Sequence, residues 1–209
     1  MAKYKEAKCK ICRREGAKLF LKGERCHSEK CSFERKPYGP GNHGKDKKRV
    51  TEYKLQLREK QKTKAVYGML EKQFGIFYDR ADLKKGATGT NLLRMLECRL
   101  DNVVYRLGLA TSRAQSRQLI NHRHFAVNGI ATDIPSFIVK EGDVVAVKGT
   151  SKNSKIFKET LEGAGERVSV PSWLELNKDE MSGKVVRLPE REDITEDVKE
   201  NLIVELYSK

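Results

Sequence analysis

Four cysteines near the start of the chain have the spacing of a metal site, Cys9-x2-Cys12-x13-Cys26-x4-Cys31. Two close pairs separated by a short loop allow four thiolates to converge tetrahedrally on one ion, a pattern typical of structural zinc sites. Because four cysteines fill the coordination shell, no position remains for a reacting water. We therefore predict one structural Zn²⁺ and no catalytic metal.

Disulfide bonds, unrelated free thiols and an iron–sulfur cluster are the alternatives to zinc. The first residues contain no apolar stretch of the signal-peptide type, which favours a reducing compartment where disulfides are rare. The flanking residues give an iron–sulfur cluster no support, and His27 is adjacent to a shell that the cysteines already complete. Residues 1–36 also contain few apolar side chains, and a segment below about 40 residues seldom folds without a cross-link such as a bound metal.

Basic residues are concentrated in the first third of the chain. The chain carries 43 Lys and Arg against 29 Asp and Glu, for a formal charge of +14. Residues 1–64 carry +13, residues 65–158 carry +7, and residues 159–209 carry −6. This asymmetry predicts a polyanionic partner. Nucleic acid fits better than a membrane, because no apolar run approaches the roughly 20 residues that span a bilayer.

A basic helix is expected after the cysteine segment. Thr51 is a capping residue, and the stretch that follows to about Tyr67 places Lys54, Arg58 and Lys62 on one stripe.

Two more helices are expected over residues 71–81 and 91–107, the second with an apolar ridge and a terminating Gly108. Residues 37–44 are rich in proline and glycine, which forbids regular structure. The exposed amides of this loop suit phosphate contacts, and a plain linker is the equal alternative.

The next segment has the pattern of a helix followed by a small sheet. Ser112 is expected to cap a helix with Arg113 and Arg117 on its outer face. The residues that follow alternate around a two-residue turn signal, and a later run is continuously apolar. The expected strands are residues 125–127, 130–132 and 144–147, with the turn at Asn128-Gly129. Apolar runs at residues 173–176, 185–188 and 203–206 are expected to pair as strands near the end of the chain.

Several of these runs resemble the RNA-binding domain named after bacterial small-subunit ribosomal protein four. They are residues 99–108, 112–113, 118–120, 127–129, 135–136 and 142–143. Outside that domain, further runs resemble the same ribosomal protein family, at residues 13–16, 57–62, 67–68 and 202–209. The resemblance covers essentially the whole chain, and the four-cysteine start resembles the zinc-binding form of the family.

Pattern and resemblance together predict an α+β chain. It comprises an N-terminal zinc module with a basic linker, a helical domain, an inserted small αα-plus-β RNA-binding domain, and a C-terminal segment that closes the fold with a short β segment. The corresponding ranges are 1–50, 51–97, 98–158 and 159–209.

The resemblance implies a structural, non-enzymatic component of the small subunit of the cytoplasmic ribosome. Such a protein is a primary binder of small-subunit rRNA that nucleates assembly of the subunit body. It also contributes to the region where mRNA enters and to translational accuracy. The implied partners are rRNA, mRNA and neighbouring ribosomal proteins, notably protein five, with no membrane and no small-molecule substrate.

Folded RNA presents phosphates in a fixed shape, so the expected contacts are mainly cations. A merely solvated surface is the alternative for each of them. The candidates are Lys3, Tyr4, Lys10, Arg13, Arg14, Lys45, Lys47, Arg49, Lys54, Arg58, Lys60, Lys62, Arg113, Arg117, His122 and Arg123.

The chain departs from the family pattern at Arg123, where the resemblance implies a glycine. A non-glycine residue there is expected to adopt a left-handed backbone, and it either carries a small strain or adds a cation that faces RNA. The resemblance also implies a more basic loop than this chain has at Asp46. Any contact of this loop with mRNA is therefore expected from Lys45, Lys47 and Arg49.

The sequence also has features of two other classes of protein. An RNA-modifying enzyme is suggested by the tripeptide Arg99-Leu100-Asp101, which resembles that of pseudouridine synthases. However, Asp101 is expected in mid-helix with no evident partner acid or base. A DNA-binding zinc protein would need a recognition helix and a dimer seam, and the sequence indicates neither.

Overall fold

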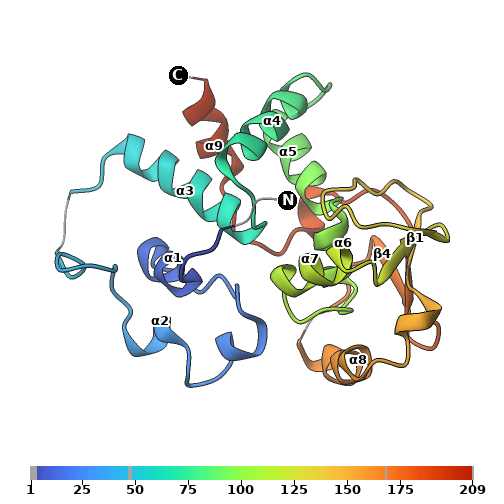
Figure 1. Cartoon of the computed structure of the whole chain (residues 1–209). Coiled ribbons are helices and arrows are strands. Elements are labelled where there is room, and N and C mark those ends of the chain that lie inside the picture. Colours follow the sequence, from blue (N-terminus) through green and yellow to red (C-terminus); the bar gives the residue numbers. More distant parts are fainter. Residues whose placement is uncertain (1–3, 47–48, 168, 209) are drawn as a thin grey trace. The chain divides into compact units, whose positions relative to one another are not determined.

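The computed structural model describes residues 4–46, 49–167 and 169–208 (Figure 1). The chain forms two compact units, one of Met1–Leu92 with Glu196–Lys209 and one of Leu93–Thr195. The second unit is thus inserted into the sequence of the first. Within the described residues, no helix has the length and apolar character needed to cross a membrane.

The first unit is built from helices. The predicted basic helix is confirmed: it begins after Thr51, whose side chain accepts a hydrogen bond from the backbone N–H of Lys54 at 3.3 Å. The predicted helix over residues 71–81 is also confirmed. The elements are α1 (Lys8–Glu15), a 3-10 helix (Gly23–Cys26), α2 (Ser32–Arg35), α3 (Glu52–Val66), α4 (Glu71–Asp82), the beginning of α5 (Thr88–Glu97) and α9 (Glu200–Tyr207).

Helix α9 shows that one predicted strand is wrong. The sequence predicts a strand over residues 203–206, where the structure has a helix. A short apolar run does not distinguish a buried strand from a helix face. The helix is favoured because Ile203 becomes fully buried, and Tyr207, one turn later, stacks on Tyr78 of α4 with ring centroids 4.2 Å apart. Gln56 on α3 also donates a hydrogen bond to Glu205 at 3.0 Å.

Glu71, at the start of α4, joins that helix to α3. Its carboxylate accepts hydrogen bonds from Lys60 and from Lys64, the latter at 2.8 Å. Burial by itself raises the pKa of Glu71, but the two lysines outweigh it and lower the pKa to about 2. Because the folded-state pKa is depressed, the stabilisation is present above the unfolded pKa near 4.5 and is lost as the pH falls toward 2.

We therefore expect Glu71→Gln to lower the free energy of unfolding at pH 7 by about 0.5–1 kcal/mol, a small value because the carboxylate is half exposed. At pH 2.5 the variant and the parent chain should differ less. Urea unfolding at several pH values measures both. If the difference in the free energy of unfolding stayed constant between pH 7 and pH 2.5, the ionised Glu71 carboxylate would not be the source of the stabilisation.

The second unit packs helices against a five-stranded antiparallel sheet. The order of the strands is β2-β1-β3-β5-β4, and every neighbouring pair is antiparallel. The elements are the rest of α5, α6 (Leu100–Arg106), α7 (Arg113–Asn121), β1 (Phe125–Val127), β2 (Ile130–Ala131), β3 (Val144–Val147), α8 (Lys155–Arg167), β4 (Leu174–Asn177), β5 (Ser182–Val185) and 3-10 helices at Gly149–Ser151 and Arg191–Asp193.

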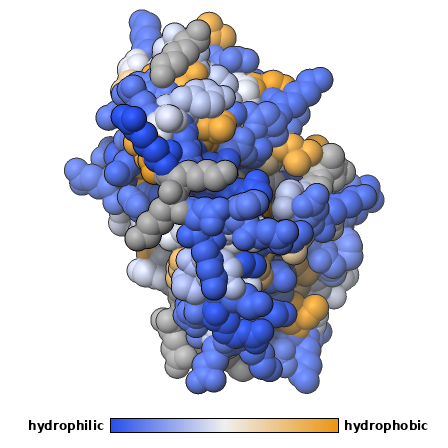
Figure 2. All heavy atoms as spheres, turned by 90° about the vertical axis from the view of Figure 1, so that its left-hand side faces the viewer, coloured by the Kyte–Doolittle hydropathy of each residue, from blue (hydrophilic) through white to orange (hydrophobic). Residues whose placement is uncertain are grey.

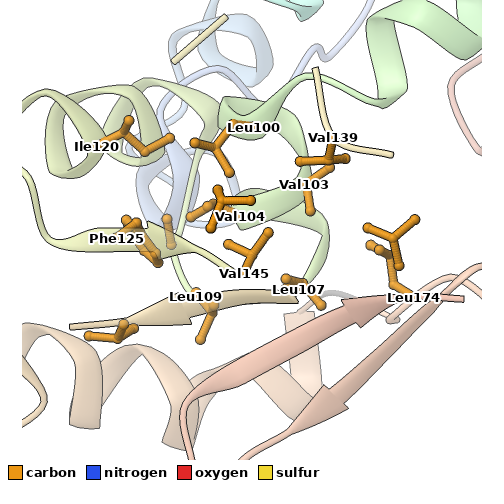
Figure 3. Packing of buried hydrophobic residues seen from close by; sticks show 14 of the residues in the cluster. Leu100, Val103, Val104, Leu107, Leu109, Ile120, Phe125, Val139, Val145 and Leu174 are labelled. Carbon is orange, nitrogen blue, oxygen red and sulfur yellow. The ribbon is translucent and has the colours of Figure 1, made fainter. Parts of the chain in front are cut away.

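One hydrophobic core holds this unit together. Leu100 and Val103 of α6, with Leu107 directly after that helix, face Phe125 of β1 and Val145 of β3, and all five are fully buried (Figure 3). Burial of side chains of this size stabilises a fold by about 1.5–3 kcal/mol each. The predicted combination of helices and a small antiparallel sheet is confirmed.

The predicted hairpin is confirmed as well. Val127 pairs with Ile130 across a two-residue loop in which Asn128 and Gly129 have φ of 49° and 79°. These left-handed conformations are those of a tight hairpin turn, which explains the Asn-Gly sequence.

The C-terminal β segment is present but shifted. The second strand lies at Ser182–Val185 instead of residues 185–188. Its register places Gly183 against Leu107, where any larger side chain would collide. The position of the strand therefore depends on this close contact, which the apolar run alone does not reveal.

The single helix predicted over residues 91–107 is wrong, because the structure divides it into α5 and α6. Arg99 has an extended backbone, with ψ of 138°, and forms an isolated bridge with Ile138. The backbone N–H of Leu100 donates to the Phe137 carbonyl at 2.8 Å, and that of Asp101 donates to the Pro135 carbonyl at 3.0 Å. Carbonyls from a distant part of the chain therefore accept the hydrogen bonds that carbonyls of the same helix would accept in a continuous helix. Asp101 consequently lies in the first turn of α6 and not in mid-helix.

Candidate nucleic-acid interface

The cysteine segment forms a small module at the start of the first unit. Cys9 and Cys12 lie on α1, Cys26 ends the 3-10 helix, and Cys31 directly precedes α2. All four are free thiols; Cys12, Cys26 and Cys31 are buried, and Cys9 is half-buried. All four cysteines that the spacing singles out thus lie on or beside the short helices of this module.

Burial disfavours the thiolate form of two of the sulfurs, and backbone hydrogen bonds partly oppose this effect. The backbone N–H of Lys22 donates to Cys26 Sγ at 3.3 Å. Burial raises the pKa of the Cys12 and Cys26 thiols, and a backbone hydrogen bond from Leu19 partly opposes this for Cys12. Both thiols also interact electrostatically with the remaining cysteines, so the four lie close enough to repel one another when ionised.

These contacts fit a zinc site in their donor chemistry, since N–H···S bonds stabilise metal-bound thiolates. The described residues nevertheless contain no group of three or more His, Cys, Asp or Glu side chains already arranged to hold a metal. Zinc therefore stays a prediction.

Arg13 on α1 binds the loop that follows the module. Its Nε donates to the carbonyls of Lys36 and Tyr38 at 3.2 and 3.0 Å, and a terminal nitrogen donates to the Gly39 carbonyl at 3.3 Å. Its guanidinium also lies 5.1 Å from the Tyr38 ring centroid. Within the loop, the Gly39 N–H donates to the carbonyl of Gly44, where a Cβ would collide with Gly39. The predicted irregular loop is thus folded back on itself, and Arg13 anchors it.

Replacing Arg13 by glutamine should loosen this loop. Net stabilisation by one hydrogen bond is about 1 kcal/mol, so we expect amide hydrogens of residues 37–46 to exchange about fivefold faster. Hydrogen exchange followed by mass spectrometry measures the change. The matched control is Arg14→Gln, at the exposed neighbouring residue, and equal protection in both variants would contradict the anchoring role.

The residues predicted to contact RNA fall into two groups. One group is solvent-exposed and available to a partner: Tyr4, Lys10, Arg14, Lys45, Arg49, Lys54, His122 and Arg123. The other is half-buried and bonded within its own unit: Arg13, Arg58, Lys60, Lys62, Arg113 and Arg117. Lys3 and Lys47 lie outside the described residues.

Most of the basic stripe on α3 is used within the first unit. Arg58 pairs with Glu15 at 3.1 Å, where the carboxylate is almost fully buried. Lys62 pairs with Glu59 and also bonds Asp197, and Lys60 pairs with Glu71. These pairs join α3 to α1, to α4 and to the segment before α9. Lys54 is the exposed member of the predicted stripe.

Helix α7 begins at the predicted cap, with the Ser112 hydroxyl accepting from the Gln115 N–H at 3.3 Å. Its arginines do not lie on the outer face, which is a correction. Arg113 donates to Asn102 Oδ1 at 2.7 Å and lies 4.7 Å from the Tyr105 ring centroid. Arg117 lies 3.7 Å from Asp101, and burial lowers the pKa of its guanidinium. Because α6 supplies these partners, helical spacing alone does not reveal the orientation.

Arg123 has the predicted left-handed backbone, with φ of 62°. Its side chain is 71% exposed and pairs with Asp133 at 2.9 Å. An exposed pair of this kind contributes little to stability, so the guanidinium can exchange Asp133 for a phosphate at small cost.

Other exposed cations lie between Cys12 and Cys31 and were not among the predicted contacts. Lys22, Arg25 and Lys30 are all exposed. Their density within the cysteine segment is the signal that would have identified them. The face shown in Figure 2, on the side of α1, α2 and α3, is mostly hydrophilic, with apolar residues in small separate spots. Such a face suits a charged, hydrated partner.

Comparison with known proteins identifies the family. Residues 3–97 match the ribosomal protein S4/S9 N-terminal domain, and residues 98–145 match the S4 domain. The chain is 57% identical to the small ribosomal subunit protein uS4 of Ruminiclostridium cellulolyticum, 58% to that of Acetivibrio thermocellus and 54% to that of Solidesulfovibrio magneticus. Each alignment covers 100% of both proteins. The chain therefore belongs to the ribosomal protein uS4 family.

Proposed function

We propose that this chain is a structural component of the small ribosomal subunit and binds its rRNA. The observation that carries the proposal is the full-length identity of more than half with relatives named small ribosomal subunit protein uS4. The exposed cations of the cysteine module, the anchored loop and the end of α7 support it, since a fixed array of Lys and Arg suits the phosphates of folded RNA. The role is structural and needs no catalytic residue.

The finer role that we propose is that of a primary binder, which nucleates assembly of the subunit body in the cytoplasmic ribosome. Lys45 and Arg49 are exposed beside the anchored loop and are the proposed contacts where mRNA enters. Exposed Val186 and Leu188 of the C-terminal segment support a contact with the neighbouring protein five. Both contacts are proposals that the family resemblance motivates.

We also propose that Cys9, Cys12, Cys26 and Cys31 hold one structural Zn²⁺. When bound, the ion supplies the cross-link that this module, with its few apolar residues, requires to fold. The residues themselves supply four sulfurs and a backbone N–H bond from Lys22 to Cys26.

RNA binding is tested by titrating the pure full-length protein with a small-subunit rRNA transcript at several salt concentrations. We expect a clear preference over an unrelated RNA of equal length, and equal affinity for both would overturn the proposal. Arg14→Gln should flatten the salt dependence by about one phosphate contact, whereas Arg13→Gln, at a residue engaged with the loop, should not. Lys178→Gln, at an exposed residue in the acidic C-terminal segment, is the control for loss of charge alone.

A further inference from the structure

An aromatic residue of the cysteine module faces outward. Phe20 is 41% exposed, whereas its neighbour Leu19 is only 8% exposed. Apolar side chains are scarce in this module, so a phenylalanine outside its interior is not explained by packing of the core.

The backbone keeps the ring in this position. Phe20 has φ of 48°, in the left-handed region that bulky residues rarely adopt. Strained conformations of this kind persist where the surrounding structure enforces them, and they concentrate at binding sites.

A second ring supports the first. The ring of His27 stacks on Phe20 with centroids 4.9 Å apart and planes 28° from parallel. Lys18 Nζ lies 5.6 Å from the Phe20 centroid while it pairs with Glu34. His27 is itself exposed, so the two rings form a small aromatic stack at the surface of the module.

The charges nearby indicate which ligand suits this stack. Exposed Lys22, Arg25 and Lys30 each lie within three positions of Phe20 or His27 in the sequence, and a combination of cations and aromatic rings is typical of sites that bind single-stranded nucleic acid. An apolar protein segment would find little other apolar surface in this module. An unpaired base offers a flat face to the rings and a phosphate to the cations.

We propose that Phe20 and His27 form a platform on which one unpaired base of the bound RNA stacks. The proposal rests on the rRNA binding proposed above and assigns a base contact to a module that otherwise offers phosphate contacts.

The test compares Phe20→Leu with Phe20→Tyr in the full-length protein. Leucine keeps an apolar side chain but has no aromatic face, whereas tyrosine keeps the ring. With a small-subunit rRNA transcript, we expect Phe20→Leu to bind roughly tenfold more weakly with an unchanged salt dependence, which is the effect of losing one base stack. Phe20→Tyr should bind within about twofold of the parent chain. One unpaired base should be protected from chemical modification by the parent and the Tyr variant, and reactive with the Leu variant.

Equal binding by all three proteins would overturn the proposal. It would also be overturned if both variants bound weakly and lost amide protection across residues 8–35, because the ring would then serve packing of the module. Either result leaves the preference of the parent chain for rRNA intact. Failure of that preference would instead overturn the proposed function itself.

Discussion

A Cys12→Ser variant should lose its zinc, and residues 8–35 should unfold while the second unit stays folded. Cys12 is buried on α1, and the proposed zinc would join α1 to the segment that holds Cys26 and Cys31. Structural zinc in small modules contributes about 10–16 kcal/mol, far more than the few apolar residues of this segment can supply. This is the largest effect that we expect from any single substitution.

Metal content and amide hydrogen exchange together measure this result. The parent chain should hold one zinc, and chelation should reproduce the effect of the substitution. Cys98→Ser is the matched control, because Cys98 is a buried thiol of the second unit and its loss should leave the metal content unchanged. If amides between Cys9 and Cys31 stayed protected after chelation, zinc would not be the element that folds the module.

Glu97→Ala should destabilise the second unit by about 3–5 kcal/mol, the usual cost of removing one partner of a buried ion pair. Glu97 is only 1% exposed. Its two carboxylate oxygens accept from Arg106 at 2.9 and 3.0 Å, and one also accepts from Asn102 at 2.8 Å. Asn102 in turn accepts from Arg113, so the same group helps to orient an arginine of α7.

Urea unfolding followed by tryptophan fluorescence measures this loss of stability. Trp173 is the one tryptophan of the chain and is fully buried in the second unit. Glu97→Gln keeps the shape of the side chain and should have an intermediate effect. Glu175→Ala, on the exposed side of β4, should change the free energy of unfolding by less than about 0.5 kcal/mol. A Glu97→Ala variant as stable as Glu175→Ala would show that the ion pair contributes little.

Features that depend on neighbouring residues could be predicted from the sequence. Thr51 and Ser112 cap their helices, and Asn128-Gly129 forms the hairpin turn. Arg123 adopts the left-handed backbone expected from the missing glycine. The capping and turn residues limit their own dihedral angles or bond a backbone group within three positions, whereas the backbone of Arg123 follows from the glycine that the family resemblance implies at that place.

Features that depend on distant partners could not be predicted. The division between α5 and α6 requires carbonyls of residues 135 and 137, which no periodicity reveals. The cations of α3 were visible, but whether they face solvent depends on Glu15, Glu71 and Asp197. Sequence therefore identified which residues are basic, whereas the fold determined which of them are available to a partner.

Helix α9 has a consequence for how the protein is made. Gln56 and its partner Glu205 are 149 positions apart, so α3 and α4 leave the ribosome long before the helix that covers them. The inserted unit, Leu93–Thr195, is complete earlier and can fold during that interval. At a synthesis rate of about 5–20 residues per second, the interval lasts roughly 10 s. During this time the rings of Phe74 and Tyr78 lack their stacking partner Tyr207. Because this apolar surface is then uncovered, the nascent chain is most prone to aggregate.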